Sequence, residues 1–97
     1  MPFKAVWTQT TPGDPSTVTI APDANDFLLA FYVNDANTVN DFTPPAGWTE
    51  ACELQNNTDN QSFVVWYKKA DGTETSLSFD ANPGNIGIAA VVSLSGL

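Results

Sequence analysis

The sequence contains no histidine, no arginine, only three lysines and a single cysteine among its 97 residues. Histidine is the side chain most often used for general acid–base catalysis near neutral pH, and it completes the triad of serine hydrolases. The chain also lacks the Gly-x-Ser-x-Gly turn of a serine nucleophile and the glycine-rich motifs that hold phosphates. We therefore expect no enzyme activity, no catalytic residue and no cofactor.

Positive charge is scarce, because eleven acidic residues face three lysines and the net charge is −8. Such a surface repels the phosphates of nucleic acids and the headgroups of anionic lipids, so we expect neither a nucleic acid nor a membrane as a partner. The lone Cys52 cannot form an internal disulfide, and no apolar targeting segment is present. These absences predict a protein that is made in the cytoplasm and is free of disulfides.

Metal and carboxylate chemistry has weak support in the sequence. Asn34-Asp35-Ala36-Asn37 and Asp59-Asn60 offer oxygen ligands for calcium, but without the spacing of a calcium-binding loop. Aspartate and asparagine are common in turns because their side chains hydrogen-bond the local backbone. The same reasoning applies to carboxylate pairs of the glycosidase type. We expect no metal site and no catalytic pair, although such a pair could be drawn from Asp35, Asp41, Asp59 or Asp80.

Short apolar segments alternate with clusters of turn-forming residues along the whole chain. No window of twelve residues free of proline and glycine carries the apolar stripe of a helix. Turns are indicated by Pro12-Gly13-Asp14-Pro15, Asp71-Gly72 and Asn82-Pro83-Gly84-Asn85. The pattern predicts one domain over 1–97, a single antiparallel β-sandwich of seven or eight short strands, either jelly-roll or immunoglobulin-like. Its expected strands are 3–10, 17–20, 27–33, 48–55, 62–69, 76–80 and 86–94.

Three of these segments, 27–33, 63–67 and 86–92, are apolar on both faces of the strand that they would form. Alternate residues of a strand point to opposite faces, and a two-layer sandwich needs only one apolar face per strand. We expect the second set to be covered partly by the chain itself and partly by another molecule. We assign to this second set Leu28, Ala30, Tyr32, Val64, Trp66, Ala89 and Val91.

The aromatic residues allow two interpretations. Flat rings with a polar edge could form a platform on which a sugar stacks. Alternatively, Trp48 and either Trp66 or Tyr67 anchor the core, which is the interpretation that we favour. The candidates for a sugar platform are Trp7, Tyr32, Trp48, Trp66 and Tyr67.

Several motifs resemble a β-sandwich module of tailed-phage virion proteins. In that module a Pro-Pro-x-Gly-Trp turn precedes a strand, a Tyr-x-Lys-x-Ala-x-Gly strand and turn follow, and an alanine-rich strand closes the fold. This chain departs from the module at Asn25-Asp26, where glycine is usual, and at Ser93-Leu94, which replace a tyrosine. The resemblance covers residues 17–97 and is carried by Val18-Thr19-Ile20, residues 26–31, residues 43–49, residues 64–74 and residues 89–97.

The resemblance implies a virion structural protein, most simply a capsid decoration protein that binds the assembled shell and stabilises it. Its partners would be the major capsid protein or another virion protein, with self-association on the particle. It would be made in the host cytoplasm and lie on the capsid surface. The alternative is a tail-fibre or receptor-binding module that recognises surface carbohydrate through exposed tryptophan or tyrosine. Residues 1–6 precede the matched region and could form an N-terminal arm, and our candidate interface residues are Pro2, Phe3, Lys4, Trp7, Tyr32 and Trp66.

Overall fold

The computed structural model describes residues 3–9, 16–34, 43–56, 61–79 and 87–95, which form seven strands and no helix. Every strand pairs with its neighbours in antiparallel fashion, so the prediction of an antiparallel all-β sandwich is confirmed. The strands are β1 (Phe3–Thr8), β2 (Ser16–Thr19), β3 (Phe27–Asn34), β4 (Thr49–Asn56), β5 (Gln61–Lys69), β6 (Ser76–Phe79) and β7 (Gly87–Leu94).

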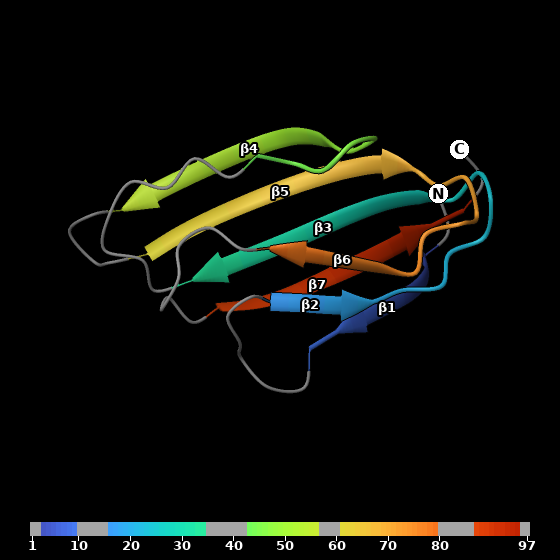
Figure 1. The fold of residues 1–97 in the computed structure, drawn as a ribbon, viewed down its shortest axis with the longest axis horizontal. Coiled ribbons are helices and arrows are strands. Elements are labelled where there is room, and N and C mark those ends of the chain that lie inside the picture. The colour runs from blue at the N-terminus through green and yellow to red at the C-terminus, as the bar shows by residue number, and fades with distance from the viewer. Residues whose placement is uncertain (1–2, 10–15, 35–42, 57–60, 80–86, 96–97) are drawn as a thin grey trace.

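The two layers differ in size (Figure 1). One is a five-stranded sheet in the order β1-β7-β3-β5-β4, and the other is the β2-β6 pair, which crosses one face of the larger sheet. The strands pair in a nested way: β1 with β7, β2 with β6 and β3 with β5. This is the pairing that results when a long antiparallel hairpin folds over to form two layers. In an immunoglobulin sandwich the first two strands share a sheet, whereas here they lie in different sheets. The strand order is therefore of the jelly-roll kind, with β4 added at one edge.

The core lies between the two layers and is built around an aromatic stack. The ring of Phe79 on β6 lies between those of Tyr32 on β3 and Trp66 on β5, at centroid distances of 4.8 and 4.3 Å. Each large apolar side chain that leaves water in this way contributes about 1.5–3 kcal/mol to folding. Around the stack, the buried apolar side chains are Val18, Ile20, Leu28, Ala30, Val64, Ala70, Leu77, Ala89 and Val91.

The turn before β4 anchors one end of this core. The amide of Trp48 donates to the carbonyl of Pro45 at 3.1 Å, and Gly47 has a φ of 90°, a conformation that residues with a Cβ rarely adopt. The half-buried Trp48 side chain packs against the core cluster. The prediction that Trp48 and one of Trp66 or Tyr67 are core anchors is confirmed, with Trp66 as the second anchor.

The structure corrects our assignment of the strand faces. The seven residues that we expected to need a cover form the core, because β2 and β6 lie over them. They are Leu28, Ala30, Tyr32, Val64, Trp66, Ala89 and Val91. Tyr32 and Trp66 are only 2% and 3% exposed, so the prediction that these two residues lie at an interface is wrong. The uncovered residues are the alternate ones in the same strands.

The N-terminal segment is also corrected. Residues 3–6, expected as part of an arm, belong to β1, which pairs with β7 at one edge of the large sheet. The register of β1 shifts between Phe3 and Ala5, so Phe3 and Val6 both lie on the exposed side of the sheet. Lys4 forms ion pairs with Asp23 and Asp26 of the same chain. Pro2 lies outside the described residues.

Candidate docking surface

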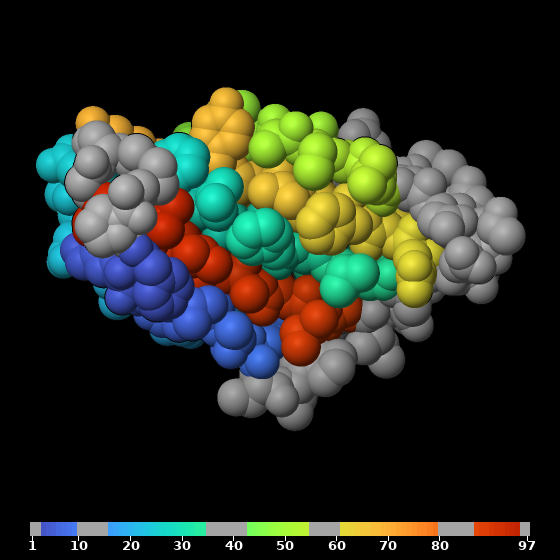
Figure 2. Space-filling model, turned by 180° about the vertical axis from the view of Figure 1, so that it is seen from behind, coloured from blue at the N-terminus to red at the C-terminus, as the bar shows by residue number. Residues whose placement is uncertain are grey.

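The five-stranded sheet has the β2-β6 pair on one side only. Figure 2 shows the opposite side, where the side chains of β4, β5, β3, β7 and β1 lie next to one another with no described strand above them. We call this side the outer face. It belongs to the five-stranded sheet, and no described strand covers it.

Cross-strand register assembles the outer face from residues far apart in the sequence. Alternate residues of β3 point outward, and each has an outward neighbour on β7 and on β5. These side chains therefore form rows across the sheet, in which directly opposite residues contact one another. The rows are Phe3, Leu94, Phe27 and Lys69; Val6, Val92, Leu29, Tyr67 and Thr49; Thr8, Ala90, Phe31, Val65 and Cys52; and Ile88, Val33, Phe63 and Leu54.

The outer face holds every large apolar side chain that the described part of the chain exposes. Leu54 and Phe3 are the most accessible, at 67% and 63%, and lie at opposite corners. Single exposed apolar residues are normal, but a continuous apolar area on a small protein marks a binding surface. The remaining exposed members are Val6, Val33, Tyr67 and Ile88.

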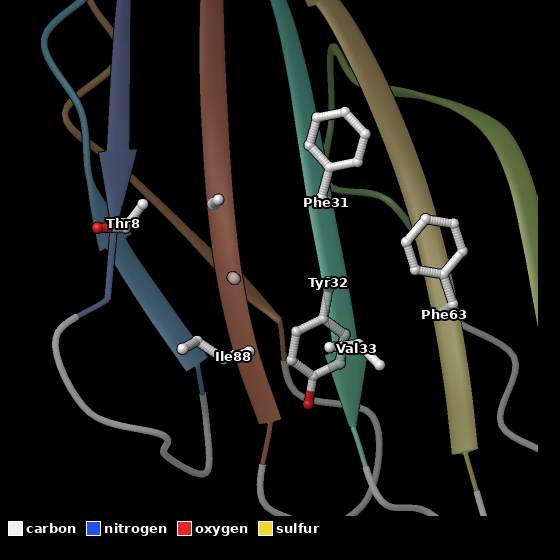
Figure 3. A pocket seen from close by; sticks show the side chains of 8 residues that line it. Thr8, Phe31, Tyr32, Val33, Phe63 and Ile88 are labelled. Carbon is white, nitrogen blue, oxygen red and sulfur yellow. The ribbon is translucent and has the colours of Figure 1, made fainter.

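A shallow hollow of about 240 Å³ lies toward one end of the outer face (Figure 3). The rings of Phe31 and Phe63 lie on neighbouring strands beside it, and Val33 and Ile88 lie nearer to the strand ends. Tyr32 and Ala89 point into the core, so the side chains that face the hollow from the outer face are hydrocarbon apart from that of Thr8. The hollow could therefore accept an apolar side chain of another protein, and Ala89 and Ala90 complete its lining.

Acidic side chains lie away from the outer face wherever the structure describes them. Glu50 and Glu53 pair across the strands with Trp66 and Val64, which places both glutamates on the inner side of β4. Asp23 and Asp26 belong to the turn before β3, and Asp71 and Glu74 to the connection between β5 and β6. Within the rows of the outer face, the one charged side chain is Lys69, at the margin.

At the end of the sandwich where β3 begins, Lys4 joins β1 to the rest of the domain. Its Nζ atom lies 3.1 Å from Oδ1 of the buried Asp26 and also contacts the exposed Asp23. Burial alone would raise the pKa of the Asp26 carboxyl, but hydrogen bonds from Lys4, the Asp23 amide and the Ser93 hydroxyl outweigh it and lower this pKa below its ordinary value. The hydrogen bonds to Asp23 and then to Asp26 raise the pKa of Lys4.

The predicted interface residues thus have different locations. Phe3 lies exposed on the outer face, Lys4 forms internal ion pairs, and Trp7 is partly buried against the core. Tyr32 and Trp66 belong to the core. The outer-face residues that sequence reasoning missed are the odd-numbered positions of 27–33 and 63–67 and the even-numbered positions of 88–94.

The described residues form no site for the metal binding or the paired-carboxylate chemistry that we considered from the sequence. Among the described residues, no group of three or more histidine, cysteine, aspartate or glutamate side chains is placed to hold a metal ion. Asp35, Asp41, Asp59 and Asp80 lie outside the described residues. In the same part of the chain, no helix is long and apolar enough to cross a membrane. Comparison of the chain with family models, curated proteins and solved structures gave no match in any of the three.

Proposed function

We propose that this protein is a structural component of a phage particle, a capsid decoration protein that binds the assembled shell and stabilises it. The observation that carries the proposal is the outer face, an apolar sheet surface that this chain does not cover with any described strand. The resemblance of residues 17–97 to a virion β-sandwich module supplies the particular assembly. A protein built to act through contacts with other proteins needs such a surface and needs no catalytic side chain.

The proposed mechanism requires only binding. Burial of apolar surface drives association, and polar residues at the rim set its specificity. The net charge of −8 keeps unassembled subunits soluble. A protein that binds the assembled shell and has no affinity for its separated components stabilises the shell by mass action, because disruption must first release the bound protein.

A reconstitution experiment tests this proposal. Purified protein is added to shells assembled without it, and bound protein is measured by co-sedimentation. Thermal disruption of the shells is then followed by light scattering, with an unrelated acidic protein of similar size as the control. We expect saturable binding and an upward shift of the disruption temperature. Absence of bound protein, or binding without any shift, would count against a decoration function.

Carbohydrate recognition has less support as the function. Of the five aromatic residues considered for a sugar platform, Tyr32 and Trp66 lie in the core, and Trp7 and Trp48 pack against it. Tyr67 reaches the outer face, where its ring stacks on Phe27 at a centroid distance of 5.9 Å. A glycan array with wild-type protein and the Tyr67→Ala variant would favour this alternative if it found specific binding that the variant lost.

A further inference from the structure

We infer that the outer face is covered by a second copy of this chain, so that two five-stranded sheets pack face to face in a dimer. The inference rests on the proposed function: the outer face would serve the self-association of the decoration protein, and the shell would be bound by other surfaces of the dimer. Four properties of the outer face support a second copy: its area, its lack of charge, its shape and the protection of the neighbouring sheet edge.

The area is sufficient for a specific dimer. The sheet has five strands, and its central strand β3 has eight residues. With strands about 4.8 Å apart and about 3.4 Å per residue, the face measures roughly 24 by 27 Å, or about 600 Å². Two copies would together bury about 1,200 Å², which reaches the lower end of the range for specific interfaces, about 1,200–2,000 Å².

The distribution of charge favours a second copy over a partner that is recognised by charge. The rows of the outer face contain Lys69 as their one charged side chain, at the margin, although the whole chain carries −8. A basic partner would find no acidic group to pair with on this face. A second copy brings an equally uncharged surface, and the described acidic residues of both copies then lie away from the contact.

The shape of a sheet suits self-association as well. Two sheets that pack face to face need a compatible twist, and two copies of one sheet have the same twist by construction. A two-fold dimer uses the same patch on both subunits, so an apolar side chain from each copy could enter the hollow on the other.

Self-association through the β4 edge is disfavoured by two features of that strand. The register of β4 shifts between Glu50 and Cys52, and such a bulge interrupts the regular backbone pattern that another strand would pair with. Glu50 and Glu53 would also bring like charges together in a pair of β4 strands. The outer face carries neither obstacle.

Sedimentation equilibrium of the full chain at roughly 1 to 500 µM tests the inference in the concentration range of weak specific interfaces. We expect a concentration-dependent species of twice 10.4 kDa. Ile88→Lys and Val33→Lys each place a charge beside the hollow, at side chains that are 42% and 40% exposed and therefore tolerate substitution in the folded subunit. Each should weaken dimerisation at least about tenfold, because a lysine would be buried without a partner.

Thr19→Lys is the matched control, because Thr19 is exposed on β2, in the layer opposite to the outer face. It adds the same charge and should dimerise at least as well as wild type. Thermal unfolding of all three variants checks that each subunit is folded. Added salt should strengthen the wild-type dimer, because it screens the repulsion between two subunits of charge −8.

Cys52, the single cysteine, lies at the β4 margin of the outer face and reports on whether the face is covered. We expect iodoacetamide to alkylate Cys52 more slowly in the dimer than in the Ile88→Lys variant. A strictly monomeric protein, or a dimer that both face variants form as readily as wild type, would overturn the inference. Protection of Cys52 only after shells are added would also overturn it, in favour of a shell protein as the occupant.

The two proposals fail in different experiments. A monomer that binds and stabilises shells would remove the dimer and leave the decoration function. A dimer of the expected kind that does not bind shells would remove the decoration function and leave the dimer.

Discussion

Lys4 Nζ lies 3.1 Å from Oδ1 of Asp26, so an N-terminal edge strand is tied to the turn that begins β3. The same buried carboxylate accepts hydrogen bonds from the Asp23 amide and the Ser93 hydroxyl, each at 3.0 Å. The Asp26 carbonyl accepts a further hydrogen bond from the Ala70 amide at 2.7 Å. One residue therefore connects β1, the β2–β3 turn, the end of β5 and β7 at one end of the sandwich.

We expect Asp26→Asn to lower the midpoint of thermal unfolding by several degrees at pH 7. The amide keeps the size of the side chain but loses the charge that pairs with Lys4, and it places an NH₂ group where two donors already converge. Circular dichroism at increasing temperature measures the change. Asp23→Asn removes the exposed partner of the same lysine and serves as the control with a smaller expected effect. Equal stability of wild type and Asp26→Asn would contradict the connecting role of this carboxylate.

The folded state should lose stability as the pH becomes acidic. Hydrogen bonds from Thr73 lower the pKa of Asp71. For Asp26 and Glu74, burial alone would raise the pKa, but hydrogen bonds outweigh it, so the pKa of each carboxyl lies below its ordinary value. A carboxyl whose pKa is lower in the folded state contributes stability above its ordinary value, 3.8 for Asp and 4.5 for Glu, and this contribution is lost as the pH falls through the folded value.

We therefore expect the unfolding midpoint to be nearly constant between about pH 5 and 8, because no histidine titrates there, and to fall below about pH 4. The raised pKa of Lys4 adds a contribution that is fully present below its ordinary value of 10.5 and is lost as the pH rises through the higher folded value. The Asp26→Asn variant should show a smaller fall in acid than wild type. A midpoint that rises on acidification would contradict the assigned directions.

Phe79→Ala should be among the most damaging single substitutions. The ring is 1% exposed and stacks on both Tyr32 and Trp66, so its removal leaves a cavity between the two layers. Substitutions of this kind cost about 3–5 kcal/mol, measured as the free energy of unfolding in urea. Thr19→Ala, on the exposed side of the same small sheet, should cost less than about 1 kcal/mol. A loss below about 1 kcal/mol for Phe79→Ala would mean that β6 does not seal the core.

The sequence was sufficient to predict the strands and the excess of apolar faces, but not which face the chain covers. In 27–33 the residues Leu28, Ala30 and Tyr32 are about as apolar as Leu29, Phe31 and Val33, so a period of two residues marks both sides equally. The choice is made by tertiary packing, because β2 and β6 contribute Val18, Leu77 and Phe79 to one side only. Register, which aligns Phe31 with Ala90 and Val65, likewise depends on pairings between distant segments that periodicity does not contain.

Two buried serines, one on β5 and one on β7, should respond to the same substitution with opposite changes in the free energy of unfolding. Ser62 and Ser93 are both buried, at 2% and 0% exposure, on strands that flank β3. Ser93 Oγ donates to Asp26, whereas Ser62 Oγ has no hydrogen-bond partner in the described structure. A buried hydroxyl without a partner costs free energy, because it has left water and gained nothing in return. The two positions therefore offer the same chemical change in two different polar environments.

We expect Ser62→Ala to leave stability unchanged or raise it by up to about 1 kcal/mol, because the substitution removes a polar group whose hydrogen bond is missing. Ser93→Ala should instead destabilise, since the Asp26 carboxylate loses a donor that it cannot replace from solvent while buried. Urea unfolding of both variants at pH 7 gives the two signs directly. Once the pH falls below the lowered pKa of Asp26, the Ser93→Ala loss should shrink, because protonation of Asp26 weakens the hydrogen bond in wild type too. Destabilisation of similar size in both variants would contradict this reading, since it would mean that the Ser62 hydroxyl does have a partner in solution.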